Sequence, residues 1–254
     1  MQLRILGCSG GIGGTLQTTS MLVDHDILVD AGTGVTALTL SELEQIDHVF
    51  LTHAHLDHIA ALPLIVDTVG TIRTKPLVVH CLPEVKKSLQ DHIFNWKIWP
   101  DFGQLPSKDE PFLVWDTIEL GETIELDDRR FTALPANHVV PAVGFWLDSG
   151  KSSLVFTGDT TSNDALWEVV NGIANLRYLI IETAFPNTER ELAIQSKHLC
   201  PSLLAEELGK LEHTVQVFIT HLKPGAVTQT MAEVQEDALQ FGPRMLANGQ
   251  VFRF

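Results

Sequence analysis

Three histidines and one aspartate lie within residues 53–58, which have the sequence HAHLDH. The stretch directly follows the apolar residues 49–51, which predict a buried β-strand ending at the first histidine. Imidazole and carboxylate groups are common zinc ligands, so this density indicates a metal site. The candidate ligands, which two adjacent cations could share, are His53, His55, Asp57 and His58. A histidine-rich surface loop without metal is the alternative, but such loops do not usually follow a buried strand.

The same order, a short apolar run and then a ligand-type side chain, recurs at three other places. Residues 154–158 precede Asp159, residues 217–220 precede His221, and residues 131–134 lie shortly before His138. In layered α/β proteins, binding sites lie outside the carboxyl ends of the strands. We therefore expect four strand ends to converge on one site.

The succession His-x-His-x-Asp-His, a lone His, Gly-Asp-Thr and Thr-His resembles the metallo-β-lactamase superfamily of hydrolases, over most of the chain. The resemblance implies an α/β fold, the αβ/βα four-layer sandwich of the metallo-β-lactamase type. It also implies two Zn²⁺ ions, with Mn²⁺ or Fe²⁺ as alternatives. The ligands it implies are His53, His55 and His138 for the first metal, Asp57, His58 and His221 for the second, and Asp159 as the bridge.

Asp30 is a further candidate, because family members place the matching aspartate beside the metal site. A carboxylate there can orient a ligand imidazole through its free N–H. A plain turn residue is the competing interpretation of Asp30, which closes a predicted hairpin over residues 21–30.

Length and charge restrict the function classes. The 254 residues contain no linker-like stretch, so we expect a single domain over residues 1–254. A net charge of −15 without a basic cluster argues against a nucleic-acid partner. No apolar run is long enough for a membrane span, and a strand predicted from residue 2 leaves no room for a signal peptide. Three scattered cysteines fit a reducing compartment, so we expect a cytoplasmic protein.

The expected ligands suit hydrolysis. Two divalent ions lower the pKa of a shared water towards roughly 7 and polarise a substrate oxygen. The nucleophile is therefore expected to be a metal-bridging hydroxide, and no Ser-His-Asp arrangement is needed. His55 stands where flavodiiron oxygen reductases of the superfamily place a Glu that holds iron, so the chain resembles a zinc-type hydrolase.

Two segments outside the metal set indicate the branch of the superfamily. Residues 182–187 (ETAFPN) and 197–201 (KHLCP) are most similar to class II 3′,5′-cyclic-nucleotide phosphodiesterases, and more distantly to tRNase Z. The resemblance implies hydrolysis of a cyclic nucleotide, cAMP first, to the 5′-monophosphate. Its implied catalytic residues are His198 as proton donor to the leaving alkoxide, Glu182 as the carboxylate that orients it, and Asp57. A helix-terminal surface residue is the competing interpretation of His198.

Two departures from the family pattern leave the substrate open. Thr161 follows Asp159-Thr160 where class II enzymes commonly have Gly, and Ala60-Ala61 stand where a Gly or Ser is usual. The alternatives are a promiscuous phosphodiesterase for small diesters, a tRNase Z-like endoribonuclease, and a non-catalytic metal-binding module.

Strand and helix patterns predict two α/β halves. Helices are expected at 59–70, 83–93, 162–174, 201–212 and 228–240. Strands are expected at 76–80, 177–181 and 215–219. The strands expected between residues 112 and 157 form a second sheet. A last strand, at 249–253, belongs to the second half of the chain. The aromatic-rich residues 94–102 are expected to cover the pocket, form a homodimer interface or build a satellite core.

Overall fold

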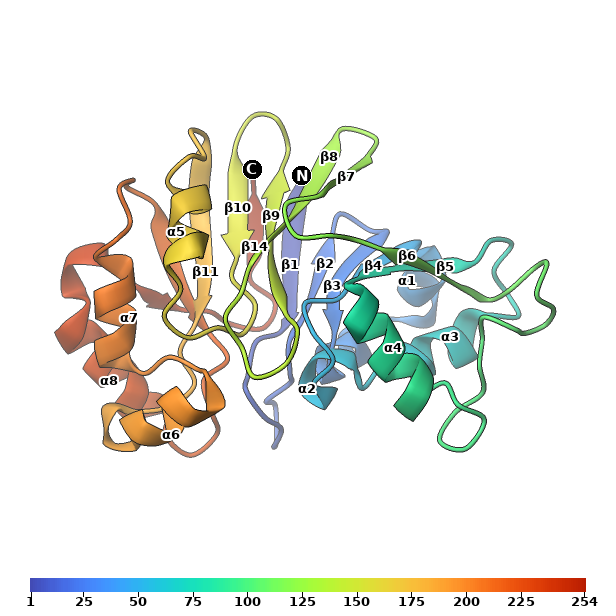
Figure 1. The fold of residues 1–254 in the computed structure, drawn as a ribbon, viewed down its shortest axis with the longest axis horizontal. Coiled ribbons are helices and arrows are strands. Elements are labelled where there is room, and N and C mark those ends of the chain that lie inside the picture. Colours follow the sequence, from blue (N-terminus) through green and yellow to red (C-terminus); the bar gives the residue numbers. More distant parts are fainter.

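The computed structural model describes residues 1–254, which form two seven-stranded sheets (Figure 1). The first sheet, in the order β14-β1-β2-β3-β4-β5-β6, consists of β1 (Gln2–Gly7), β2 (Ser20–Val23), β3 (Ile27–Ala31), β4 (His48–Phe50), β5 (Leu77–Cys81), β6 (Leu113–Thr117) and β14 (Val251–Arg253). The second, in the order β13-β12-β11-β10-β9-β8-β7, consists of β7 (Thr123–Leu126), β8 (Arg129–Pro135), β9 (Val143–Asp148), β10 (Ser153–Phe156), β11 (Leu176–Glu182), β12 (Gln216–Thr220) and β13 (Arg244–Met245).

Helices cover the outer faces of both sheets (Figure 1). On the first sheet these are α1 (Leu40–Gln45), α2 (Leu56–Ile59), α3 (Leu62–Val69), α4 (Pro83–His92) and the 3₁₀ helix η1 (Thr33–Ala37). On the second they are α5 (Asp164–Val170), α6 (Arg190–Ser196), α7 (Pro201–Leu208), α8 (Val227–Asp237) and the 3₁₀ helices η2 (Asn187–Glu189) and η3 (Leu239–Phe241).

Strands buried on both faces explain the layering. In β11, Tyr178 and Ile180 point into the core between the two sheets, whereas Leu179 and Ile181 pack under the helices. Successive side chains of a strand point to opposite faces, so one apolar run contributes to both cores.

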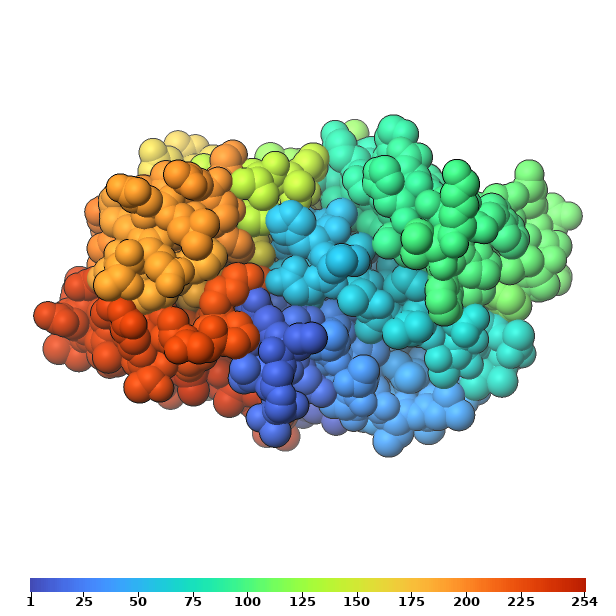
Figure 2. Space-filling view, turned by 90° about the horizontal axis from the view of Figure 1, so that it is seen from below, coloured from blue at the N-terminus to red at the C-terminus, as the bar shows by residue number.

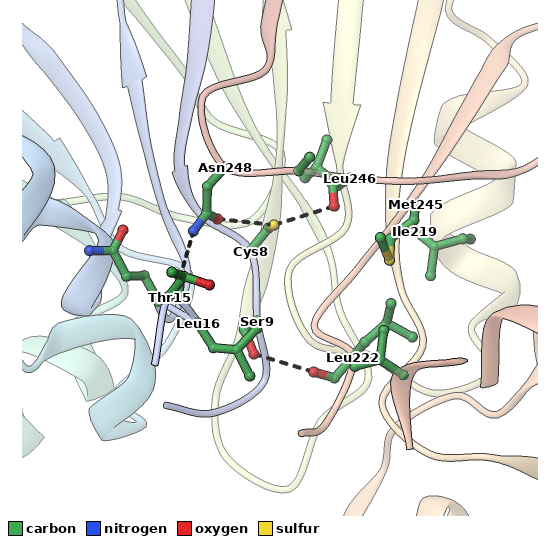
Figure 3. Close-up of a pocket in the computed structure, with 12 residues that line it drawn as sticks. Cys8, Ser9, Thr15, Leu16, Ile219, Leu222, Met245, Leu246 and Asn248 are labelled. Atoms are coloured by element: carbon green, nitrogen blue, oxygen red, sulfur yellow. Dashed lines mark hydrogen bonds between the residues drawn. The ribbon is translucent and has the colours of Figure 1, made fainter. Parts of the chain in front are cut away.

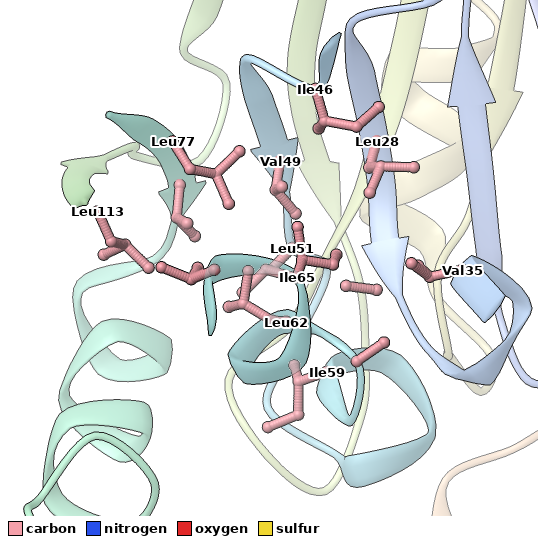
Figure 4. Close-up of a cluster of buried hydrophobic side chains, with 14 of the residues drawn as sticks. Leu28, Val35, Ile46, Val49, Leu51, Ile59, Leu62, Ile65, Leu77 and Leu113 are labelled. Atoms are coloured by element: carbon pink, nitrogen blue, oxygen red, sulfur yellow. The ribbon is translucent and has the colours of Figure 1, made fainter. Parts of the chain in front are cut away.

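The core under the first sheet's helices shows the outer layer directly (Figure 4). Val49 of β4 and Leu51, which directly follows this strand, pack there against Leu62 and Ile65 of α3. A matching core lies between the second sheet and α5, α7 and α8. Helix, sheet, sheet and helix therefore form four layers, which confirms the expected αβ/βα sandwich.

Two strands lie in a different sheet from the one predicted. β6 was expected to begin the second sheet, but it pairs in parallel with β5 at the edge of the first. α4 supplies the crossover that parallel strands require. β14 was expected to complete the second half, but it pairs antiparallel with β1, which brings the two chain ends together.

The predicted helix over residues 59–70 corresponds to α3, and α2, within residues 53–59, was not predicted. Pro63 lies in the first turn of α3, where its missing N–H costs nothing, and Gly70 follows the last helical residue. Two short helices, α1 and α6, were not predicted. A capping box formed by Thr39 and Glu42 begins α1.

The aromatic segment 94–102 packs mainly on the first sheet's core. Phe94 and Phe102 are buried in that core, and Phe94 lies edge-on to Trp115. Trp96 and Ile98 remain 58% and 64% exposed. The buried rings therefore belong to the first sheet's core and not to a separate satellite core, and the homodimer through this segment stays a prediction. The structure contains no helix with the length and apolar character of a membrane span.

Candidate metal centre

The predicted ligands meet where β4, β8, β10 and β12 end. Figure 2 shows the corresponding face of the molecule, on which segments far apart in the sequence adjoin one another. The ligand residues form two sets, and within each set the candidate ligand atoms lie within 4.8 Å of one another. One set contains His53, His55, His138 and Asp159, and the other contains Asp57, His58 and His221. We call these seven residues the ligand cluster.

Asp159 lies between the two sets. Its Oδ2 is 3.6 Å from Nε2 of His53 and 3.4 Å from Nε2 of His58. Its Oδ1 is 3.4 Å from Nδ1 of His221. Asp57 adjoins the same set, with Oδ2 3.6 Å from Nε2 of His221. The geometry therefore places Asp159 where a bridging carboxylate would be needed.

Buried nitrogens without partners show that the cluster suits a cation. Nε2 of His53, Nε2 of His58 and Nδ1 of His221 are buried and lack a hydrogen-bond partner. Leaving buried polar atoms unsatisfied is costly, so native structures seldom do it without a reason. A divalent cation would satisfy these lone pairs, and the donor set of imidazole and carboxylate fits zinc.

Electrostatics keeps most of the imidazoles available as ligands. Burial lowers the pKa of His53, and it lowers the pKa of His138 to about 4 and that of His221 to about 3. A neutral imidazole has a lone pair for a metal. His58 differs, because Asp159 and Asp30 outweigh the effect of burial and raise its pKa well above the usual value.

Three contacts orient the ligand rings. Asp30, in the left-handed region with φ +57°, places Oδ2 2.7 Å from Nδ1 of His58. The hydroxyl of Thr52 lies 2.9 Å from Nδ1 of His53, and the carbonyl of Lys197 lies 3.1 Å from Nδ1 of His138. Each ring thus has its second nitrogen turned towards the cluster. The Asp30 contact agrees with the role expected for it, whereas sequence reasoning missed Thr52 and Lys197.

Glu182 and His198 form a separate pair beside the cluster. Oε1 of Glu182, at the end of β11, lies 2.7 Å from Nδ1 of His198. The Glu182 carboxylate also accepts the backbone N–H groups of Thr160 at 3.1 Å and Leu199 at 3.2 Å. Burial alone would lower the pKa of His198, but the Glu182 carboxylate raises it above the usual value. The ring of His198 stacks on His221, with centroids 5.2 Å apart. It is also close enough to Asp159 and His221 to ligate a metal with them.

A cleft of about 560 Å³ lies next to His138. Its walls include Asn137, the apolar residues 139–143, Leu82 and Lys197. A smaller hollow beside His55 shares Glu84, Val140 and Pro141 with it. No residue of the segment 94–102 lines either space, so its predicted role as a pocket cover has no support here.

A second cavity, of about 290 Å³, contains none of the predicted ligands (Figure 3). Its wall is mainly apolar, with Ile219, Leu222 and Leu246, and it includes Cys8. Burial raises the pKa of the Cys8 thiol to about 11, so the thiol stays protonated and is a poor nucleophile or ligand. The carbonyl of Cys8 nevertheless accepts the N–H of His221 at 2.9 Å, which holds the strand end that carries this candidate ligand.

Comparison with known proteins finds cyclic-nucleotide phosphodiesterases among the relatives. A probable 3′,5′-cyclic-nucleotide phosphodiesterase of Yersinia pestis is 24% identical over 205 residues, 71% of this chain and 58% of that protein. A 3′,5′-cyclic-nucleotide phosphodiesterase of Aliivibrio fischeri is 26% identical over 272 residues, 86% of this chain and 80% of that protein. The chain thus spans about three fifths of the first relative's length. Ribonuclease Z enzymes are also among the relatives.

Solved structures share the fold. Unliganded yeast PDE1 has a TM-score of 0.83 and 18% identity, and the match covers 100% of this chain and 99% of that one. The metallo-beta-lactamase fold protein YhfI of Bacillus subtilis has a TM-score of 0.77 and 18% identity, with 99% of both chains covered. The family model of the beta-lactamase superfamily domain matches residues 25–237, well over half of the chain. This chain belongs to the beta-lactamase superfamily.

Proposed function

We propose that the chain is a metal-dependent phosphodiesterase that hydrolyses 3′,5′-cyclic nucleotides, cAMP first, to 5′-monophosphates. The observation that carries the proposal is the position of His198, which Glu182 holds beside the ligand cluster. The cluster alone would suit many hydrolases. A proton donor at its edge suits a reaction whose leaving group is an alkoxide.

The metal ligands proposed are His53, His55 and His138 for one ion, Asp57, His58 and His221 for the other, and Asp159 between them. We propose Zn²⁺ for both ions, with Mn²⁺ or Fe²⁺ as alternatives. Such ions, when bound, activate a water molecule and polarise a phosphoryl oxygen. Asp30, Thr52 and the carbonyl of Lys197 fix the ring orientations that binding requires.

His198 supplies the proton in this proposal. Its Nδ1–H points at Glu182, so Nε2–H of the protonated ring can donate to the departing 3′-oxygen. The Glu182 carboxylate raises the pKa of His198, which favours the protonated ring. Glu182 in turn is fixed by two backbone N–H groups, which hold the pair in one orientation.

Ribonuclease Z activity is the second candidate, because such enzymes are among the relatives. It requires a surface that attracts RNA, and a net charge of −15 opposes this. A relaxed specificity for small diesters is the nearer alternative, since the apolar residues 139–143 form part of the wall of the cleft beside His138.

A substrate panel with metal-loaded protein tests the proposal. The panel contains cAMP, cGMP, bis(4-nitrophenyl) phosphate and a precursor tRNA. We expect cAMP to give 5′-AMP and the tRNA to remain intact. Cleavage of the precursor tRNA at low enzyme concentration, or turnover of the nitrophenyl ester without either cyclic nucleotide, would replace the proposed substrate with one of the alternatives.

A further inference from the structure

Lys223 lies beside the ligand cluster but has no part in it. The residue follows β12 by three positions and His221 by two. Its Nζ donates a hydrogen bond to the carbonyl of Gly10 at 2.9 Å and lies 3.4 Å from Nε2 of His221. The side chain is half-buried. An ammonium group therefore occupies the immediate surroundings of a candidate metal ligand.

The backbone fixes the position of this ammonium group. The N–H of Lys223 donates to the carbonyl of Ala184 at 3.0 Å, and the N–H of Gly10 donates to the carbonyl of Leu222 at 3.0 Å. A Cβ added to Gly10 would lie 2.4 Å from the carbonyl oxygen of His221, so only glycine allows this close approach. His221 itself has φ +64°, a strained conformation that tight packing must maintain. The lysine and its acceptor are thus held together by several independent contacts.

The charge of Lys223 is not neutralised within the protein. Lys223 forms no ion pair with a carboxylate, although the chain has 32 acidic and only 17 basic residues. The nearby carboxylates of Asp57 and Asp159 belong to the ligand cluster. Bound cations would repel an ammonium group so close to them, and this repulsion is strong in a partly buried site. An anion between the ammonium group of Lys223 and the cations would offset this repulsion, because both positive charges attract it.

We propose that Lys223 binds the phosphoryl group of the substrate and of the product through a non-bridging oxygen. The inference rests on the proposed phosphodiesterase function, for which it names a substrate-binding residue outside the metal ligands. His198 stacks on the ring of His221, whose Nε2 lies beside Lys223, so both donors adjoin one ligand. His198 serves the leaving oxygen, and Lys223 holds an oxygen that stays on phosphorus.

The test measures binding of inorganic phosphate to the zinc-loaded protein by calorimetry, with metal content determined in parallel. Lys223→Met removes the charge and keeps the chain length, and Lys223→Arg retains the charge. Lys151→Met is the matched control, because Lys151 is exposed and forms no ion pair. We expect Lys223→Met to weaken phosphate binding by about 10–100-fold, as for loss of a charged hydrogen bond. Lys223→Arg should retain most of the affinity, and Lys151→Met should match the wild type.

Equal phosphate affinity in wild type and Lys223→Met, at equal zinc content, would overturn the proposal. Loss of zinc from Lys223→Met would overturn it as well, since the residue would then support the metal site. Phosphate binding can be measured without catalysis, so its outcome does not depend on the outcome of the substrate panel. A protein that cleaves no cyclic nucleotide can still show the Lys223-dependent affinity.

Discussion

The ligand cluster and the Glu182–His198 pair lie side by side but are stabilised in different ways. Nitrogens of His53, His58 and His221 in the cluster are buried without partners. The Glu182 carboxylate, by contrast, is fully bonded by His198 and two backbone N–H groups. The cluster therefore has polar atoms that the protein leaves unsatisfied and is in this sense incomplete, whereas the pair is complete within the protein. Metal loss and loss of the proton donor should have separable effects.

Removal of metal should have the largest effect, because it acts on the incomplete region. We expect close to two zinc-class ions per chain and complete loss of phosphodiesterase activity after chelation, with activity restored by added zinc. Metal analysis and turnover before and after chelation measure this. His53→Ala should lose metal, whereas His25→Ala, at an exposed turn, should not. A metal-free protein that still cleaves diesters would contradict the site.

Asp159→Ala should come next, since Asp159 contacts both sets of ligands. We expect turnover of every substrate to fall by at least about 10³-fold, because several kcal/mol of charge stabilisation depend on the metals. Metal occupancy should fall as well. Asp128→Ala provides a control at an exposed turn. An unchanged metal content with normal turnover would show that Asp159 is not a bridge.

His198→Ala addresses the pair, and its effect should depend on the leaving group. We expect turnover of cAMP to fall roughly 10²–10⁴-fold, with nitrophenyl substrates far less affected because a good leaving group needs no proton. Metal content should stay unchanged. Because His198 also lies within ligating distance of Asp159 and His221, a loss of metal would identify it as a ligand instead. An equal loss on both substrate types would point to phosphate binding.

The sequence was sufficient to predict the site residues that directly follow the ends of strands. His53, His138, Asp159 and His221 could be predicted because an apolar run marks each strand and the carboxyl ends of strands converge. The seven-residue ligand cluster assembled as expected. That these residues bind metal, and that His198 acts as an acid, stay predictions.

Contacts made by backbone atoms could not be predicted. The carbonyl of Lys197 orients His138, and the carbonyl of Gly10 anchors Lys223. Every residue has a carbonyl, so no residue type indicates such a role. The sheet assignment of β6 and β14 failed for a related reason. The apolar pattern of a strand shows that both of its faces are buried, but it does not show which strand lies next to it. The crossover helix α4 places β6 beside β5, and the meeting of the two chain ends places β14 beside β1.

Glu182→Gln should have the smallest effect, and the effect should depend on pH. Glu182 raises the pKa of His198, so its replacement by an uncharged amide should lower that pKa. The proton donor would then be lost at lower pH, and the upper limb of the kcat profile with cAMP should move to lower pH. At neutral pH we expect a loss of about tenfold, the effect of one pKa unit. Below the new pKa, turnover should approach that of the wild type, because His198 is protonated in both proteins.

The nitrophenyl substrate distinguishes this effect on the proton donor from a general disturbance of the site. Its turnover needs no proton from His198, so its pH profile should be the same in wild type and Glu182→Gln. The N–H groups of Thr160 and Leu199 donate to different oxygens of Glu182, so the single oxygen of glutamine can still accept one of these two hydrogen bonds. If both substrates lost activity equally at all pH values, Glu182 would support the cluster itself. The pair would then not be independent of the cluster, and the distinction between the complete and the incomplete region would fail.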